Sequence, residues 1–485
     1  MIRRLLSSFL FFLYFIPSFA QNAIDKKVYT LKECIDIALQ NNLTVKRSAL
    51  GLKSANITLD QSRYTMLPTL NLSGSTGSNY GRSIDPTTNS FVDQKIDNAN
   101  INANASLLLF NAFRVMNGIR QSVNDKAAAE NDYTKAKNDV ILTVITLYTS
   151  VIFNQELLQN AEFQLKTTQQ QLERTKKLEQ AGSVPLGNVL DLEAQNATNE
   201  LNQIQRENTY KLSLLQLKQS MQLPAYTQVE VEVPVLSVED VILDKTTEQI
   251  YDIARQNMPE IRAAVFRTES AAYGLKSARG NLFPRLSLNA GAFTNYSSAA
   301  KIASSYLITD PNPQIGYVGT DPTTTDPTLQ VKSLIPSVKV STKEKPFSDQ
   351  FSDNVSKSLS LSLTIPVFNS YSARASVLRA KVTRETAQIN LTDAENKLRQ
   401  AIETAHNDAT SAAKTYNSTI KAVKAREEAF RMTKQRYDAG ATNYVDYQVS
   451  ENNLFQAKSD QVRAKYDLIF KKKVLDFYQG KPIDY

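Results

Sequence analysis

The sequence predicts a mainly α-helical fold with four β-strands, in which very long helices pair as antiparallel coiled coils. Three observations lead to this prediction. Apolar residues recur every seven positions through stretches without proline, four segments alternate apolar and polar residues, and the second half of the chain repeats the pattern of the first. Each half reads helix, strand, loop, strand, very long helix, turn, long helix.

Residues 1–20 have the pattern of a signal peptide. Arg3 and Arg4 precede an apolar stretch, and Ser18-Phe19-Ala20 offers small residues where signal peptidase cleaves. The apolar stretch is too short to remain as a membrane helix, so we expect cleavage after Ala20 and export across the inner membrane. The rest of the chain has no unbroken apolar run of about 18 residues, so it predicts no membrane-spanning helix. If the mature chain enters a membrane, it must do so as β-strands.

The halves of the chain are related by two offsets. Five of the six residues 36–41 recur in residues 252–257, and Pro68 matches Pro284, 216 positions further on (284 − 68). Gly182 matches Gly440 at an offset of 258 (440 − 182), so 42 residues (258 − 216) are inserted between the two matched blocks.

The insertion falls in the segment of about residues 295–353, which is rich in Pro, Asp, Thr and Ser. We therefore predict two structural repeats. The first covers residues 21–236, and the second covers residues 237–485 and carries the enlarged loop. Long polar loops at one end of a membrane barrel usually face outside the cell.

Four segments are predicted to form strands. In residues 358–367 leucine, isoleucine and valine alternate with serine and threonine, and residues 100–109 alternate in the same way. Similar patterns start at Leu70 and Leu286. Such strands suit a membrane barrel or, equally, a soluble sheet with one wet face. As barrel strands they require oligomerisation, because closed barrels start at about eight strands; two chains would supply eight and three would supply twelve.

The helices are predicted to be unusually long. No proline occurs from Ala112 to Glu179, and a helix of that length would extend about 100 Å. Coiled-coil spacing is found in three places: Val144, Val151, Leu158, Leu165 and Leu172; Leu190, Ala194, Ala197, Leu201 and Ile204; and Tyr447, Leu454, Leu468 and Leu475. A generic periplasmic coiled coil would explain these helices but not the strands between them.

Several features exclude other classes of protein. The formal net charge of +8 is spread along the chain, which does not indicate nucleic-acid binding. The single cysteine, Cys34, is predicted to be a small apolar residue of the first helix. His406 is the only histidine, and no Gly-rich loop precedes a Lys-Ser or Lys-Thr pair. The sequence therefore predicts neither an enzyme nor a metal or cofactor site.

The twofold repeat, the strand pairs, the two Ala-Gly turns and the Asn or Asp six residues past each glycine resemble the TolC-like outer-membrane efflux family. The resemblance extends over essentially the whole mature chain. It implies a homotrimer that shares a twelve-stranded barrel in outer-membrane lipid and continues as a long periplasmic tunnel of helices. It also implies that the tip of the tunnel docks a periplasmic adaptor protein and an inner-membrane transporter.

The resemblance also implies a periplasmic gate. Asp446 matches the first acid of the family's closing ring, and Tyr437 matches a tyrosine that helps to hold the gate closed. In the first half the corresponding position is Asn188, with Asp191 nearby. The second acid is replaced by Val449, which predicts a differently built latch. Without the resemblance, Asp446 would be read as a carboxylate stabilised by a helix dipole, and Tyr437 as ordinary packing between helices.

The two helical turns are the predicted adaptor-docking tips, at Gly182 with Ser183 and at Gly440 with Ala441. Both glycines are also expected simply as residues that end helices. The arginine that the family has two residues after the second glycine is Thr442 here, and the glycine common after the second Pro-x-Phe is Ser370.

Together these features predict a passive outer-membrane exit duct of a tripartite efflux or type I secretion system. Its periplasmic end would be opened by the adaptor and the inner-membrane transporter, which must supply the energy because the chain has no nucleotide site. The alternative is a periplasmic coiled-coil adaptor or scaffold protein.

Overall fold

The computed structural model describes residues 27–84, 89–93, 95–233, 245–308, 315–317, 330–332 and 337–481. The predicted signal peptide and the predicted boundary between the repeats lie outside these residues. The chain divides into two compact units. One, the helical unit, contains the residues up to Leu59, Arg120–Ala272 and the residues from Lys381; the other, the strand unit, contains Asp60–Ile119 and Tyr273–Ala380. Each unit takes segments from both halves of the sequence.

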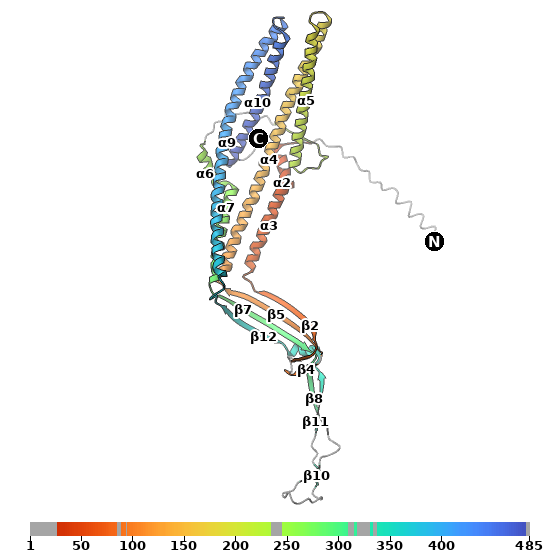
Figure 1. The fold of residues 1–485 in the computed structure, drawn as a ribbon, viewed down its shortest axis with the longest axis vertical. Helices are drawn as coiled ribbons and strands as arrows, with labels where there is room; N and C mark the ends of the chain where they lie inside the picture. The colour runs from red at the N-terminus through yellow and green to blue at the C-terminus, as the bar shows by residue number, and fades with distance from the viewer. Residues whose placement is uncertain are drawn as a thin grey trace, which may run out of the picture. The chain divides into compact units, whose positions relative to one another are not determined.

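Four long helices form two antiparallel hairpins (Figure 1). They are α4 (Arg114–Gln180), α5 (Leu186–Ser220), α9 (Ser372–Asp438) and α10 (Tyr444–Tyr478). Helices α4 and α9 have 67 residues each, and α5 and α10 have 35 each. The bounds of α4 match the proline-free stretch, so the prediction of a helix of about 100 Å is confirmed.

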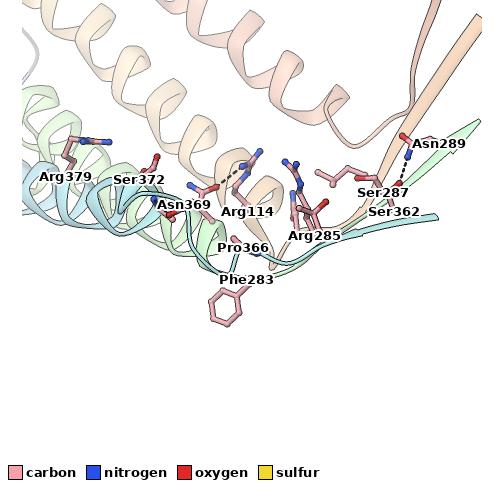
Figure 2. A pocket seen from close by; sticks show the side chains of 17 residues that line it. Arg114, Phe283, Arg285, Ser287, Asn289, Ser362, Pro366, Asn369, Ser372 and Arg379 are labelled. Atoms are coloured by element: carbon pink, nitrogen blue, oxygen red, sulfur yellow. Dashed lines mark hydrogen bonds between the residues drawn. The ribbon is translucent and has the colours of Figure 1, made fainter. Parts of the chain in front are cut away.

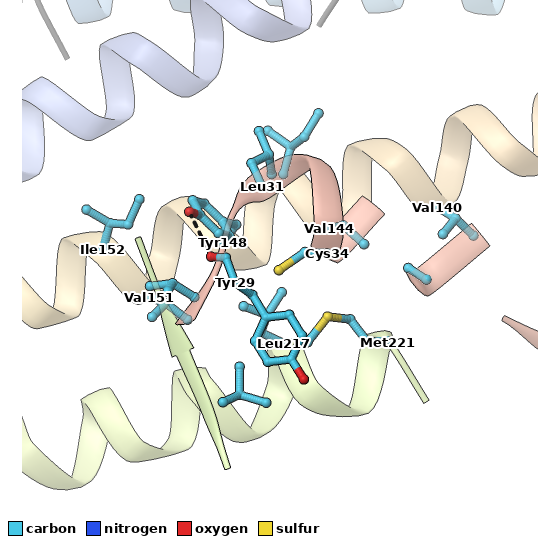
Figure 3. Close-up of a cluster of buried hydrophobic side chains, with 14 of the residues drawn as sticks. Tyr29, Leu31, Cys34, Val140, Val144, Tyr148, Val151, Ile152, Leu217 and Met221 are labelled. Carbon is cyan, nitrogen blue, oxygen red and sulfur yellow. Dashed lines mark hydrogen bonds between the residues drawn. The ribbon is translucent and has the colours of Figure 1, made fainter. Parts of the chain in front are cut away.

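A buried cluster packs short N-terminal elements against the first hairpin (Figure 3). Strand β1 (Lys27–Tyr29) pairs in parallel with β6 (Val229–Val231), and α2 (Leu31–Asn41) follows β1. Tyr148 of α4 donates a hydrogen bond of 2.7 Å from its hydroxyl to the carbonyl oxygen of Glu232. Cys34 is fully buried in this cluster, as predicted. Burial, with a smaller effect of Glu33, raises the pKa of its thiol to about 12.

A second buried cluster joins α6 (Thr247–Asn257) and the start of α7 (Pro259–Arg279) to the second hairpin. Its fully buried members include Ile250, Ala254, Ile402 and Ala409. Thr246 begins α6 with a reciprocal capping box, in which its side chain and that of Gln249 each bind the other's backbone N–H. Two other helical elements are α3 (Leu43–Tyr64) and the 3-10 turn η1 (Gly280–Leu282).

The four predicted strands form one antiparallel sheet. They are β2 (Thr69–Asn79), β5 (Ile96–Phe110), β7 (Arg285–Ser297) and β12 (Ser356–Thr364), in the order β12-β7-β5-β2. The register places Leu361 opposite Leu288, and Ser360 opposite Asn289, so apolar and polar residues take opposite faces. On the polar face, Asn289 accepts a hydrogen bond of 2.9 Å from Ser106 and donates one of 3.1 Å to Ser362.

The segment predicted as an enlarged loop contains regular structure. Strands β8 (Lys301–Ile308) and β11 (Ser337–Glu344) form an antiparallel pair, as do the short strands β9 (Ile315–Tyr317) and β10 (Gln330–Lys332). Another short antiparallel pair, β3 (Arg82–Ile84) and β4 (Phe91–Asp93), lies in the sequence between β2 and β5. In its described part, the enlarged loop predicted at about residues 295–353 therefore contains paired strands.

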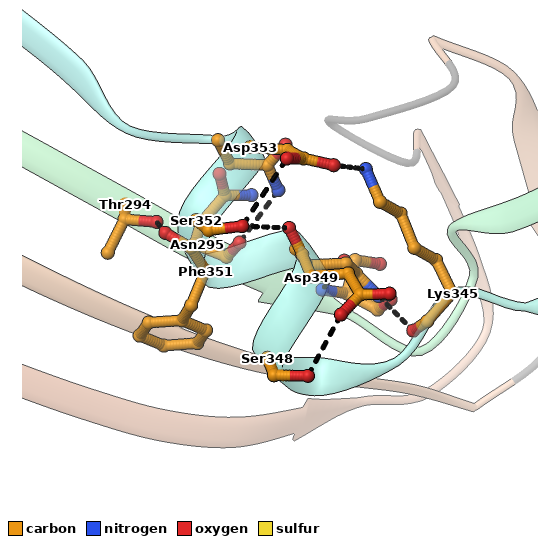
Figure 4. Close-up of polar contacts among 11 residues, drawn as sticks. Thr294, Asn295, Lys345, Ser348, Asp349, Phe351, Ser352 and Asp353 are labelled. Carbon is orange, nitrogen blue, oxygen red and sulfur yellow. Dashed lines mark hydrogen bonds and ion pairs between the residues drawn. The ribbon is translucent and has the colours of Figure 1, made fainter.

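Helix α8 (Phe347–Asp353) is fastened to the end of β7 (Figure 4). The buried amide of Gln350 accepts from the N–H of Ser297 and donates to its carbonyl oxygen, both at 3.0 Å. Thr294 donates to the carbonyl oxygen of Phe351 at 2.8 Å. The ring of Phe347 stacks on Phe351 at 4.2 Å between centroids. Contacts between residues so far apart in the sequence leave no local pattern, which explains why the contact of α8 with β7 was not predicted.

The predicted coiled-coil seam is buried on α10 but exposed on α5. Tyr447, Leu454, Leu468 and Leu475 of α10 are all buried, as predicted. The corresponding stripe of α5 is exposed: Leu190 is 55% exposed and Leu201 57%. As a seam within one chain that prediction is wrong, because α5 instead buries another face, which includes Val189, Leu192, Asn199, Ser213 and Leu217.

The seam of α4 near its C-terminal end is also shifted. Leu158, Leu165 and Leu172 are only partly buried. The fully buried positions at seven-residue spacing are the smaller Ala161, Thr168 and Thr175. The leucines of the predicted seam therefore keep surface available for contacts outside the chain.

Among the described helices, α4 contains a stretch that is long and apolar enough to cross a membrane by composition alone. A core helix can pass the same test, so the expectation of no membrane-spanning helix stays a prediction. Half of this stretch is buried within the chain. Val140, Val144 and Val151 of α4 lie in the first buried cluster, as in the core helix of a folded domain.

Candidate functional site at the helical tips

The predicted docking glycines end the long helices in two equivalent turns. Gly182 has φ +74° and Gly440 has φ +73°, a left-handed conformation that favours glycine. After each glycine the next N–H bonds back over the last turn: Ser183 to the carbonyl oxygen of Leu178, and Ala441 to that of Arg436, both at 2.8 Å. These are Schellman caps. A Cβ on either glycine would meet no atom within 4 Å, so the backbone alone requires glycine.

Asp446 lies in the first turn of α10, where it is held by the residues that start the helix. Its N–H donates to the side chain of the N-cap residue Asn443 at 2.8 Å. The hydroxyl of Thr442 donates to the Asp446 carboxylate at 2.8 Å. Thr442, which replaces the expected arginine, therefore binds the candidate gate acid within one turn. The carboxylate is exposed and lies at the positive end of the helix dipole.

The first hairpin is built differently at the same place. Helix α5 starts at Pro185, which offers no side-chain cap. Asn188 is partly buried and its N–H donates to the carbonyl oxygen of Pro185 at 3.1 Å. Asp191 is exposed one turn further along α5. The two tips therefore share their glycine turns but differ in the polar groups that follow.

Tyr437 packs in an aromatic cluster. Its ring centroid lies 5.0 Å from that of Tyr447 and 6.1 Å from that of Tyr444, and Phe430 lies 5.4 Å from Tyr447. Leu192 of α5 is buried against the same cluster, so it joins the two hairpins. Burial raises the pKa of both Tyr444 and Tyr447 above the usual range of a tyrosine, with a smaller contribution from Glu451.

Glu451 is a residue of this cluster that the sequence patterns did not bring out. It is only 6% exposed, and the hydroxyl of Tyr447 lies 3.5 Å from its carboxylate. Burial raises the pKa of the Glu451 carboxyl to about 7, against the opposing effects of the Tyr447 hydroxyl and the charge of Lys434. A signal for it exists in the sequence, because Glu451 occupies the seam position between Tyr447 and Leu454.

Polar side chains also link the helices below the tips. Gln448 of α10 donates to Gln195 of α5, which donates to Asn199 at 2.9 Å. Asn199 in turn donates to the buried hydroxyl of Thr168 on α4 at 2.8 Å. An exposed ion pair of 3.4 Å joins Arg174 of α4 to Asp438 of α9, and such a pair contributes at most about 1 kcal/mol.

These residues hold helix ends together. No group of three or more His, Cys, Asp or Glu in the described part of the chain is placed to hold a metal ion. The site brings Tyr437 together with Tyr444 and Tyr447, and places Asp446 on the outer side of the same turn. Such an arrangement can set how firmly two helical hairpins stay together.

The fold is that of an outer-membrane channel. CusC is 17% identical with a TM-score of 0.71, covering 93% of this chain and 92% of that one. The outer membrane protein VceC from Vibrio cholerae is 16% identical with a TM-score of 0.71, covering 94% of this chain and 97% of its own. The outer membrane channel CmeC from Campylobacter jejuni is 17% identical with a TM-score of 0.71, covering 93% and 85%. No curated protein sequence matches the chain significantly.

The family follows from the sequence itself. The profile of the outer membrane efflux protein family matches residues 34–221 and 250–475, which is most of the chain. The chain belongs to this family, and the resemblance to TolC-like proteins is confirmed. It is an outer-membrane exit duct of an efflux system, with a large helical portion in the periplasm. Its family and structural neighbours are transport channels, and nothing in these comparisons favours a periplasmic scaffold.

Proposed function

We propose that three copies of the chain form the duct by completing one barrel of twelve strands. The proposal rests on the two edge strands of the sheet. Strands β2 and β12 are each paired on one side only within the described sheet. Both carry exposed leucines on the apolar face, such as Leu70 at 76% and Leu359 at 74%. In lipid an open edge leaves backbone groups unpaired, so the edges require neighbouring copies.

The apolar stripe of α5 supports the same assembly. Leu190, Leu201 and Ile204 keep coiled-coil spacing but are exposed in the single chain. A seam of this kind is stable when it packs against another helix. Contact with a neighbouring copy would bury the stripe and close the helices into a periplasmic tunnel.

The two predicted repeats, 21–236 and 237–485, fit the same design. Thr30 and Thr246, 216 positions apart (246 − 30), both begin an 11-residue helix with a capping box. Ala112 and Ser370, 258 positions apart (370 − 112), both have φ near +50° between a strand and a helix of 67 residues. We infer that one half-unit was duplicated, so that each chain supplies two strand pairs and two hairpins.

The tips are proposed as the regulated end of the duct. Asp446, Tyr437, Asn188 and Asp191 would form the periplasmic gate. The exposed turns at Gly182, Ser183, Gly440 and Ala441 would contact a periplasmic adaptor, which couples the duct to an inner-membrane transporter of a tripartite efflux or type I secretion system. The duct itself is passive, and the transporter supplies the energy.

The assembly is tested by the protein mass of the detergent-extracted particle, measured by light scattering corrected for detergent. We expect a mass near three chains and extraction only with detergent. A monomer that is soluble without detergent would refute the shared barrel.

The gate is tested by single-channel conductance in planar bilayers. Asp446→Ala is expected to raise the ion leak of the closed duct, because the first turn of α10 loses its bond to Thr442. The control is Asp393→Ala, which removes an exposed aspartate of α9 that bridges to Lys397 far from the tip. Equal conductance in the wild type and Asp446→Ala would refute a gate role for Asp446.

A further inference from the structure

A polar cavity lies in the strand unit, where two strands meet the starts of two long helices (Figure 2). Its volume is about 690 Å³, which is within the range of about 300–1,000 Å³ typical of small-molecule sites. Strands β7 and β12 form one side. The first turns of α4 and α9 form the other. Nothing in the proposed gate or docking tips uses this cavity.

The charged side chains that line the cavity are all basic. Three arginines line it, Arg114 on α4, Arg285 on β7 and Arg379 on α9, and no acidic residue is among the lining side chains. The other polar groups are amides and hydroxyls, including those of Asn369 and Ser372. Two helices of 67 residues begin here, and their N-terminal ends add positive potential. The cavity therefore favours a negatively charged occupant.

Two details indicate a built site. The guanidinium of Arg114 donates to the side chain of Asn281 at 2.8 Å, which fixes its direction beside the cavity. Asn111 also lines the cavity, and its side-chain nitrogen is buried and has no acceptor among the described residues. A buried donor without an acceptor is costly, so a small turn of this amide toward an anion in the cavity would relieve that cost.

The register shows which face of the sheet the cavity occupies. Arg285 lies opposite Thr364, and Ser287 lies opposite Ser362, and all four line the cavity. These residues alternate with Leu286 and Leu363, which lie on the apolar face. In the proposed barrel the apolar face meets lipid, so the cavity opens on the polar lumen.

We propose that this cavity is an anion-binding site on the wall of the duct, which takes carboxylate or phosphate groups of small solutes in transit. The bidentate geometry of arginine suits both groups. Its position on the lumen rests on the proposed barrel, but binding of an anion does not. Three copies would place three such sites on the wall, and the duct would then favour anionic cargo.

The binding test uses the detergent-extracted full chain and tripolyphosphate, titrated by calorimetry. The double variant Arg285→Gln with Arg379→Gln should weaken binding at least about tenfold, since charge-assisted bonds are roughly twice as strong as neutral ones. The double lysine variant should keep most of the affinity. Arg374→Gln is the matched control, because Arg374 lies near the start of α9, as Arg379 does, but over the ring of Tyr371 and outside the cavity lining.

Equal affinity for tripolyphosphate in the wild type and the double glutamine variant would refute the proposed site. A loss of affinity in Arg374→Gln as large as that in the double glutamine variant would also refute it. Binding of phosphatidylglycerol micelles without binding of tripolyphosphate would also overturn it, since the site would then serve lipid head groups. Block of single-channel current by tripolyphosphate tests the lumenal position separately. Binding that persists in a protein without any channel current would support the site and contradict the duct.

Discussion

Glu451 is a carboxyl group buried where apolar side chains usually lie, and Glu451→Gln tests the consequence. The substitution keeps the shape of the side chain and an oxygen that can accept from Tyr447, but it removes the titrating proton. In the folded chain burial raises the pKa of Glu451 to about 7, against 4.5 for the unfolded group. We therefore expect the variant to differ from the wild type in its dependence on pH.

The sign follows from proton binding. Between pH 4.5 and 7 the folded wild type binds more protons than the unfolded chain, so its free energy of unfolding falls as pH rises. Below pH 4.5 both states are neutral at Glu451, and no destabilisation arises. Above pH 7 both are charged, and the folded state carries the full cost of the buried charge. At 1.36 kcal/mol per pKa unit, this cost is about 3 kcal/mol.

The assay is urea unfolding of the extracted protein, followed by circular dichroism at pH 5 and pH 8. The stability of Glu451→Gln relative to the wild type should rise by about 2 to 3 kcal/mol between these values. Glu200→Gln, at an exposed position of α5, is the control and should show no such rise. A pH-independent difference between Glu451→Gln and the wild type would refute a raised pKa.

Four further substitutions test the backbone, each by the midpoint of urea unfolding. Ser370→Gly should stabilise by roughly 0.5 to 1 kcal/mol, because Ser370 has φ +52° and glycine relieves that strain. Gly280→Ala should destabilise by about 1 kcal/mol or more, since its Cβ would lie 3.0 Å from Cβ of Arg114 and 3.3 Å from the carbonyl oxygen of Asn111. Gly440→Ala, at φ +73°, should lower the free energy of unfolding by about 1 kcal/mol. Gly51→Ala, in the interior of α3, should raise it by a similar amount.

The sequence predicted the elements whose signals are local and periodic. Period-two alternation located all four strands of the sheet, and the absence of proline located α4 to within about two residues. The Ala-Gly pairs located both turns between the long helices. These features depend on residues a few positions apart, so the chain itself records them.

Features that depend on distant partners were missed or misplaced. The pairing of β8 with β11 joins residues 29 (337 − 308) to 43 (344 − 301) positions apart, through a segment whose composition is typical of a loop. The stripe of α5 has a correct seven-residue spacing, yet spacing does not tell which helix covers Leu190. The resemblance to the family indicated Asp446 and Tyr437, but it could not indicate Glu451, whose burial is a property of this chain's own packing.

The long helices look uniform in sequence, but their buried residues change along their length. The two large buried clusters of the helical unit are made of valine, isoleucine, leucine, alanine and tyrosine. Towards the tips the buried positions include the polar Thr168, Thr175, Asn199 and Glu451, and the apolar cluster there has three buried members. Because local stability follows buried apolar contacts, we expect amide hydrogens near the tips to exchange faster than those of the large clusters. We therefore expect the tips to separate more easily than the rest of the helical unit, as the proposed gate would require.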